Sequence, residues 1–375
     1  MTADGDVALT YKWTNAALDS TTYATSENGT AITNLFDEAD PNKSSSEPGE
    51  VTWLSRSNWV ATFPTQPVVL NATQTLADHL AFTRYDGSKA DSVEMPTLGA
   101  DNGLALVSMI GADYDDPQWD TLLDQLTFNE MVNTITLGFH NTAAVESIGK
   151  TRTKDENGPQ GLTAALTGGA SAMCYTSEDV MAATFNVDLI NDVGHCIGED
   201  CLAMGYSGLY GPGINMHRTA YSGRNFEYYA SDPFVAGTIC AAEVNGIQSK
   251  GVYVYLKHVA LNDSESSRRG VNTWLNEQAA REIYLEVADK AITDGGAWSV
   301  MTGFNRWGAY WCGAYDNLLT GFLRGELGMR GTVRTDRTVS RTYRAVFHHG
   351  VMTFKRKKTW TAEQAANTAS AQNQQ

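Results

Sequence analysis

Four acidic side chains follow short apolar runs, in loop positions where a carboxylate could do chemistry: Glu227, Asp263, Glu265 and Asp336. Two carboxyl groups that flank a glycosidic bond can cleave it, because one attacks the anomeric carbon while the other protonates the leaving oxygen. An acid in such a position is more often a solvated loop residue or a helix cap. Position alone therefore leaves the choice among the four open.

Basic and aromatic residues near these acids could grip a polyhydroxylated ligand. Arg224 follows a glycine, and its guanidinium could fork two adjacent hydroxyls or a carboxylate. Lys257 and His258 close an apolar run, where a buried charge must find a partner. Two interpretations of Lys257 and His258 are equally good: they donate hydrogen bonds to sugar hydroxyls, or they form an internal ion pair with a nearby acid. Trp307 and Trp311 could stack on a sugar ring or fill the core.

The elements that must position these residues alternate along the chain. Strands are predicted at 252–256, 299–302 and 331–333, and helices at 274–292 and 318–323. Such alternation indicates parallel β-structure with crossover helices. A (β/α)8 barrel is the favoured architecture. Lys257, His258 and Asp336 would then lie at the carboxyl ends of strands, where barrel active sites form.

Upstream segments suggest a division of the chain. Apolar residues at 119, 122, 123 and 126 have the spacing of an amphipathic helix. Thr127 and Glu130 match a capping box, which predicts a helix beginning there. We expect a sandwich-like remnant at 1–62, a linker at 63–115, the barrel at 116–338, and a basic then polar tail at 339–375.

Composition limits the class of protein. The 375 residues are 42% hydrophobic and 19% charged, which supports a sizeable core. A net charge of −16 disfavours nucleic acid and anionic membranes as partners and suits a neutral sugar. Five cysteines show neither a disulfide framework nor zinc-site spacing, so no metal is expected. The sequence shows no signal peptide and no membrane-length apolar run, which makes the cytoplasm the default expectation.

Several segments in a fixed order together resemble glycoside hydrolase family 3. They read KDENGPQGL at 154–162, GPGINMHRT at 211–219, GRNFE at 223–227, KHVALND at 257–263, VMTGFN at 300–305 and TD at 335–336. The resemblance covers residues 110–336 and implies a barrel that acts on β-linked glycosides without a cofactor. The run after the Lys-His pair differs from that of the β-N-acetylhexosaminidase branch, which favours the β-glucosidase-like branch.

The resemblance also implies roles for individual residues. Asp336 would be the nucleophile of a retaining mechanism that releases terminal, non-reducing β-D-glucose or a related β-sugar. The expected sugar-binding residues are Asp155, Asn157, Arg224, Lys257, His258 and Met301. Asn157 stands where the family has an aspartate, and Asp155 is its substitute acceptor.

Three departures from the family pattern qualify this expectation. Arg334 and Arg337 stand close to Asp336, and no family pattern is recognised beyond it, which suggests a frameshift or truncation near 330–337. Segments 32–39 and 54–59 resemble the end of the family's α/β-sandwich domain, so the order would be sandwich, then barrel. The acid/base glutamate normally lies earlier in that domain, and a second chain or a missing domain would have to supply it.

Without that glutamate we expect weak activity, since general acid catalysis is worth about 10²–10⁴-fold. The alternatives are a catalytically impaired or non-catalytic carbohydrate-binding barrel fragment, and a fragment that does not fold alone because an open barrel exposes strand edges.

Overall fold

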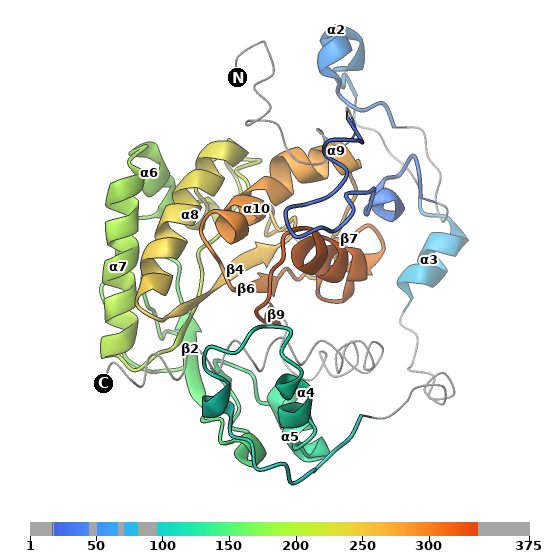
Figure 1. The fold of residues 1–375 in the computed structure, drawn as a ribbon. Coiled ribbons are helices and arrows are strands. Elements are labelled where there is room, and N and C mark those ends of the chain that lie inside the picture. The colour runs from blue at the N-terminus through green and yellow to red at the C-terminus, as the bar shows by residue number, and fades with distance from the viewer. Residues whose placement is uncertain (1–16, 18, 45–50, 67–70, 82–95, 337–375) are drawn as a thin grey trace.

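A curled, mostly parallel sheet lies at the centre of the molecule (Figure 1). The computed structural model describes residues 17, 19–44, 51–66, 71–81 and 96–336, so the predicted tail at 339–375 lies outside them. The strands, in spatial order, are β1 (Asn141–Thr142), β2 (Thr153–Asn157), β3 (Gly208–Tyr210), β4 (Tyr253–Val259), β6 (Ser299–Thr302) and β9 (Val333–Thr335). Only the β1–β2 pair of this sheet is antiparallel.

Each step from one parallel strand to the next passes through a helical segment. The segments are α6 (Glu178–Ala183) with α7 (Val187–Ala203), α8 (Pro233–Ser249), the continuous α9 (Glu277–Ala279), η8 (Ala280–Leu285) and α10 (Glu286–Thr293), and the π-helix η10 (Asn317–Glu326). Figure 1 shows α7, α8 and α10 side by side on the outer face of the sheet. The structure thus has the α/β architecture of part of a barrel. Closure of eight strands stays a prediction.

Glycines let α7 and α8 approach closely. A Cβ atom at Gly194 would come within 2.4 Å of the Glu243 carbonyl oxygen, and one at Gly246 within 2.2 Å of the Asn191 carbonyl oxygen. Any larger residue at either position would force the helices apart. The start of α8 is fixed by Asp232, whose side chain accepts a hydrogen bond from the Val235 N–H at 2.9 Å.

The main core joins the helices to the sheet and to residues 19–44. Phe36 stacks on Trp307 with ring centroids 4.1 Å apart, and both are fully buried. Trp311 is buried as well. Both tryptophans therefore fit the core alternative better than an exposed sugar platform. Residues 306–311 belong to a small second sheet made of β5 (Asn272–Thr273), β7 (Arg306–Trp307) and β8 (Tyr310–Trp311).

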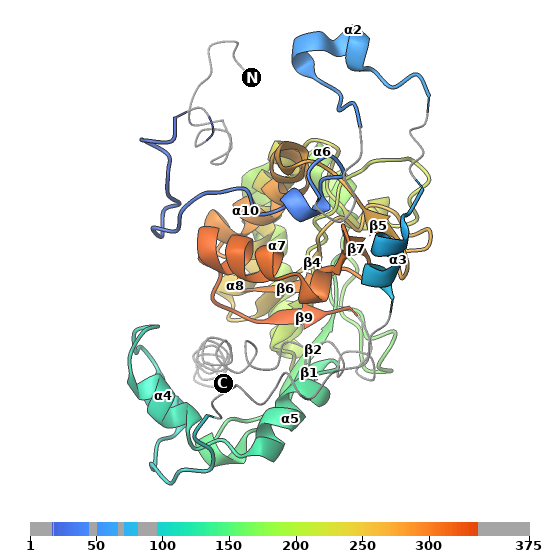
Figure 2. The same cartoon turned by 90° about the vertical axis from the view of Figure 1, so that its right-hand side faces the viewer.

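A second apolar cluster lies beside β1 and β2, where both views place the helices α4 (Gln118–Leu123) and α5 (Phe128–Thr136) (Figure 2). It contains Leu106 and Met109 together with Trp119 and Leu122, so it spans the predicted boundary at 115–116. The remaining short helices are η2 (Asp37–Ala39), η3 (Arg56–Asn58), α2 (Trp59–Thr62), α3 (Gln74–Leu80), η5 (Leu106–Met109), η6 (Glu146–Ile148), η7 (Asn225–Glu227) and η9 (Cys312–Ala314). Among the described residues, no helix has both the length and the apolar character needed to cross a bilayer.

Several local predictions are confirmed. The strand at 299–302 is β6, and Thr127 with Glu130 forms the predicted capping box. The strand predicted at 252–256 is β4, whose end was placed too early, because β4 continues to Val259; Lys257 and His258 lie in its last residues, at the carboxyl end as expected. The Lys257 N–H donates to the Pro212 carbonyl at 3.0 Å, and Lys257 pairs in register with Met301, so the strand cannot end before it.

Candidate active site

Charged side chains converge near the carboxyl ends of β4, β6 and β9. The β4–β6 register shifts between Lys257 and Val259. Such an irregularity re-aims side chains, so the consecutive residues Lys257 and His258 can both contact one cluster. Asp336 directly follows β9, and its N–H donates to the Thr302 carbonyl at 3.2 Å. The chain therefore delivers a carboxylate and two basic groups to one edge of the sheet.

Arg224 and Glu227 form the tightest contact of the cluster. Arg224 Nε lies 3.0 Å from Glu227 Oε1, and Arg224 Nη2 lies 2.6 Å from Glu227 Oε2, a bidentate pair. Lys257 Nζ lies 3.5 Å from Glu227 Oε2 and 3.4 Å from the Gly158 carbonyl oxygen. Burial would raise the pKa of Glu227, but the Lys257 and Arg224 charges outweigh it and hold that pKa below its ordinary value. The internal ion pair that the sequence left open for Lys257 is therefore present.

His258 is neutral and has a defined tautomer. Burial, with the nearby Arg224 and Lys257 charges, holds its pKa well below the ordinary value. Arg224 Nη1 lies 3.2 Å from His258 Nε2. Since a guanidinium can only donate, Nε2 accepts, and Nδ1 carries the proton that it donates to the Tyr228 hydroxyl at 3.3 Å. The backbone N–H of His258 donates to Asn215 Oδ1 at 2.9 Å, which fixes the loop at 211–219 to β4.

Asp336 faces this basic cluster. Its Oδ2 atom lies 3.5 Å from His258 Nε2 and 3.9 Å from Arg268 Nη1, and its side chain is 23% exposed. Burial raises the pKa of Asp336 to about 6, while the Arg268, Arg224 and Lys257 charges pull it down. Oδ2 has no hydrogen-bond donor within the described residues. The group is thus mostly ionised at pH 7, and its Oδ2 atom is a buried acceptor that no described group satisfies.

The other three acids are already engaged. Glu227 is held by two cations, as described above. Glu265 Oε2 lies 3.1 Å from Arg268 Nη1, and its Oε1 accepts from Asn262 Nδ2 at 3.1 Å. Asp263 accepts from the Met216 N–H, and burial raises its pKa to about 7. Of the four acids, Asp336 is the one with a buried oxygen that no described group engages.

The structure adds Arg268 to the site, a residue that sequence reasoning missed. Its guanidinium lies over the Phe304 ring at 4.5 Å and bridges Glu265 and Asp336. The spacing of three residues from Glu265 was the available signal, since such a pair can meet within one turn of chain. Nothing in the sequence pattern connected it with Asp336.

Three predicted sugar-binding residues lie apart from these contacts. Asn157 ends β2, and its N–H donates to Glu156 Oε1 at 2.9 Å. Asp155 is fully buried inside the curl of the sheet, where Arg334 Nη2 lies 3.0 Å from its Oδ2. Met301 is buried in a cluster with Tyr210, Tyr253 and Tyr255. Their contact with a sugar stays a prediction.

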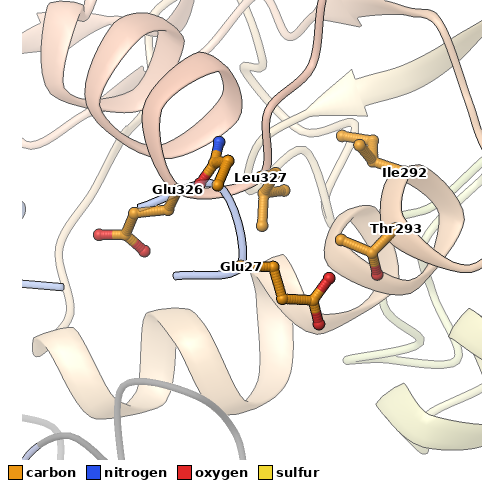
Figure 3. Close-up of a pocket in the computed structure, with 6 residues that line it drawn as sticks. Glu27, Ile292, Thr293, Glu326 and Leu327 are labelled. Carbon is orange, nitrogen blue, oxygen red and sulfur yellow. The ribbon is translucent and has the colours of Figure 1, made fainter. Parts of the chain in front are cut away.

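A surface hollow occurs at the other end of the strands. It is lined by Glu27, Asn28, Ile292, Thr293, Glu326 and Leu327, most of which are labelled in Figure 3. Those residues include the ends of α10 and η10, which lead into the amino ends of β6 and β9, so the hollow is separate from the Asp336 cluster. Within the described ranges, no group of three or more His, Cys, Asp or Glu side chains is arranged to hold a metal ion.

The fold and the site define a barrel-type α/β protein whose ionisable groups gather at the carboxyl ends of its strands. Within that class, the chain belongs to glycoside hydrolase family 3, because the model of the glycosyl hydrolase family 3 N terminal domain matches residues 137–358, more than half of the chain. That match continues past Asp336, where the sequence analysis recognised no further family pattern.

Relatives and solved structures agree with this assignment. A β-glucosidase of Rhizobium radiobacter is 34% identical over 220 residues, which are 58% of this chain and 27% of that protein. An exo-α-(1→6)-L-arabinopyranosidase of Bifidobacterium breve is 34% identical over 189 residues, 48% of this chain and 25% of that protein. The structure of β-glucosidase 3B from Thermotoga neapolitana in complex with glucose matches with a TM-score of 0.60 and 26% identity, covering 68% of this chain and 43% of that one. The chain therefore spans about a quarter of the length of such curated relatives.

Proposed function

We propose that this chain carries the nucleophile and the sugar-binding part of a retaining β-glucosidase. The observation that supports the proposal most is the buried Oδ2 atom of Asp336, which lies near the Arg268, Arg224 and Lys257 charges and has no donor within the described residues. In the proposed reaction Asp336 attacks the anomeric carbon of a terminal, non-reducing β-D-glucose. The aglycone leaves, and water then releases the sugar from the glucosyl-enzyme.

The basic residues would hold the sugar rather than transfer protons. Arg224 and Lys257 share the Glu227 carboxylate, which keeps both cations fixed in a partly dehydrated setting. Preorganised donors of this kind lose little entropy on binding hydroxyl groups. His258, which is neutral, is the third residue proposed to contact the sugar. Asn157, Asp155 and Met301 remain proposed contacts, to be tested by sugar affinity.

The general acid/base is not assigned. Glu265 is linked to Asp336 through Arg268, but both of its oxygens are engaged. We propose that a second chain or a further domain supplies the acid/base to a complete site. Activated aryl glycosides should then react best, because their leaving groups need little protonation.

The substrate class is a β-linked oligosaccharide or glycoside. A β-glucosidase and an exo-α-(1→6)-L-arabinopyranosidase are similar to this chain to the same degree, so the preferred sugar must be measured. Purified chain is tested on p-nitrophenyl β-D-glucoside and β-D-xyloside beside Asp336→Asn. Turnover that the substitution abolishes supports the proposal. A folded protein that binds glucose without turnover would instead favour the non-catalytic barrel.

A further inference from the structure

Arg334 reaches across the open side of the curled sheet. It lies on β9, which is one edge strand, and its Nη2 atom donates to the Asn141 carbonyl of β1, the opposite edge strand, at 2.9 Å. Its Nη1 atom donates to the Tyr210 hydroxyl at the end of β3. One side chain thus connects strands that are not neighbours in the hydrogen-bonded order.

The interior of the curl is built to receive this guanidinium. The fully buried Asp155 on β2 has its Oδ2 atom 3.0 Å from Arg334 Nη2. The Tyr255 and Tyr210 rings lie under the guanidinium at 4.9 and 5.0 Å from their centroids. A planar fork with five donors can meet all of these partners at once, whereas an ammonium group cannot.

β9 is a short strand for which a side-chain anchor matters. It has three residues, none of them fully buried, and within the described residues its strand partner is β6. Side chains two residues apart along an extended strand point to the same face, so the anchor at Arg334 acts on the position from which Asp336 projects. In the sequence, Arg334 suggested a lost family pattern. In the structure it is an integral part of the sheet interior.

We propose that Arg334 is a positioning residue for Asp336, because it fastens β9 to β1, β2 and β3 from inside the curl. The kinetic part of this proposal rests on the proposed role of Asp336 as nucleophile. The mechanical part, that Arg334 restrains β9, does not depend on any activity.

Hydrogen exchange tests the mechanical part. In Arg334→Met we expect the amides of β9 and Asp336 to exchange about 100-fold faster or more, because a buried ion pair is broken locally, while those of α7 and α8 keep their rates. Arg330→Met is the matched control, since Arg330 is exposed and lies over the Tyr114 ring at 4.6 Å. Unchanged exchange at β9, or an equal increase throughout the chain, would overturn the proposal. If Arg334→Met does not fold, the double variant Asp155→Asn with Arg334→Met is used, since it also removes the Asp155 charge that would otherwise be buried without its partner. It must show the same faster exchange at β9 and Asp336.

Kinetics test the positioning part. For an activated aryl β-D-glucoside, the rate of the phenolate burst, which reports attack by Asp336, should fall about 100-fold in Arg334→Met, as for a nucleophile displaced by about 1 Å, while the affinity for glucose changes little. Arg334→Lys should recover part of the burst rate, because it keeps the charge opposite Asp155. An unchanged burst rate, or a loss of glucose affinity alone, would contradict positioning of the nucleophile. If the wild-type chain shows no turnover, the proposed function fails, and the exchange result still decides whether Arg334 restrains β9.

Discussion

Replacing Arg268 by Gln should raise the pKa of Asp336 by close to one unit. Burial raises this pKa to about 6, and the Arg268 charge is the strongest influence in the opposite direction. Charges separated by the 3.9 Å between Arg268 Nη1 and Asp336 Oδ2 interact by about 1 kcal/mol in water and about 4 kcal/mol at an effective dielectric constant of about 20.

The structure favours the smaller of these energies. The two side chains are 27% and 23% exposed, so solvent screens their interaction. Glu265 Oε2 also lies 3.1 Å from the same Arg268 nitrogen and cancels part of its field. About 1 kcal/mol corresponds to roughly 0.7 of a pKa unit.

The assay follows the pH dependence of the first chemical step. Asp336 must be ionised to attack, so the rate of the 2,4-dinitrophenolate burst from 2,4-dinitrophenyl β-D-glucoside should fall as the pH drops through the pKa of Asp336. In Arg268→Gln this fall should begin at higher pH. Lys290→Gln is the matched control, because it also removes one positive charge, from a surface pair with Asp294 at 2.8 Å. If the fall of the burst rate in Arg268→Gln occurs at the same pH as in the wild-type chain, or at lower pH, the reasoning is refuted.

Three further predictions concern stability. Glu227→Gln removes the anion that Arg224 and Lys257 share and should cost about 3–5 kcal/mol in urea unfolding; a loss below 1 kcal/mol, roughly the worth of an exposed pair, would contradict the burial of this cluster. Phe36→Ala removes the ring stacked on Trp307 and should cost about 3–5 kcal/mol; an unchanged transition would show that residues 19–44 are not part of the barrel core. Burial raises the pKa of Glu243 to about 7 from the value of 4.5 that it has in the unfolded chain. Ionised Glu243 therefore destabilises the fold progressively as the pH rises from 4.5 through 7. Glu243→Gln should therefore raise Tm at pH 8 more than at pH 5, and an equal effect at both would count against it.

Local signals in the sequence predicted much of the fold. β6 is a short apolar run bounded by a tryptophan and a glycine, and the cap at Thr127 depends only on a residue three positions later. The end of β4 was misplaced because Lys257 and His258 are polar, and the residues that pair with Lys257, Gly213 and Met301, are remote in the sequence.

The site was harder to predict than the strands. Family resemblance singled out Asp336, Arg224, Lys257 and His258, and the structure brings these four together. Spacing could not reveal that Arg334 reaches Asp155 across the sheet, since that contact depends on how the strands curl. Arg268 was missed for the same reason, because a loop carries it to Asp336.

The most direct test of the central claim is the mass of the intact protein after brief reaction with 2,4-dinitrophenyl β-D-glucoside. If a second chain or a further domain supplies the acid/base, as proposed, the glucosyl-enzyme of this chain alone should accumulate, and azide should release it as β-D-glucosyl azide. The account predicts an increase by one glucosyl residue, located by peptide mapping on Asp336 and absent from Asp336→Asn. An adduct on another carboxylate, or an unchanged adduct in Asp336→Asn, would contradict it.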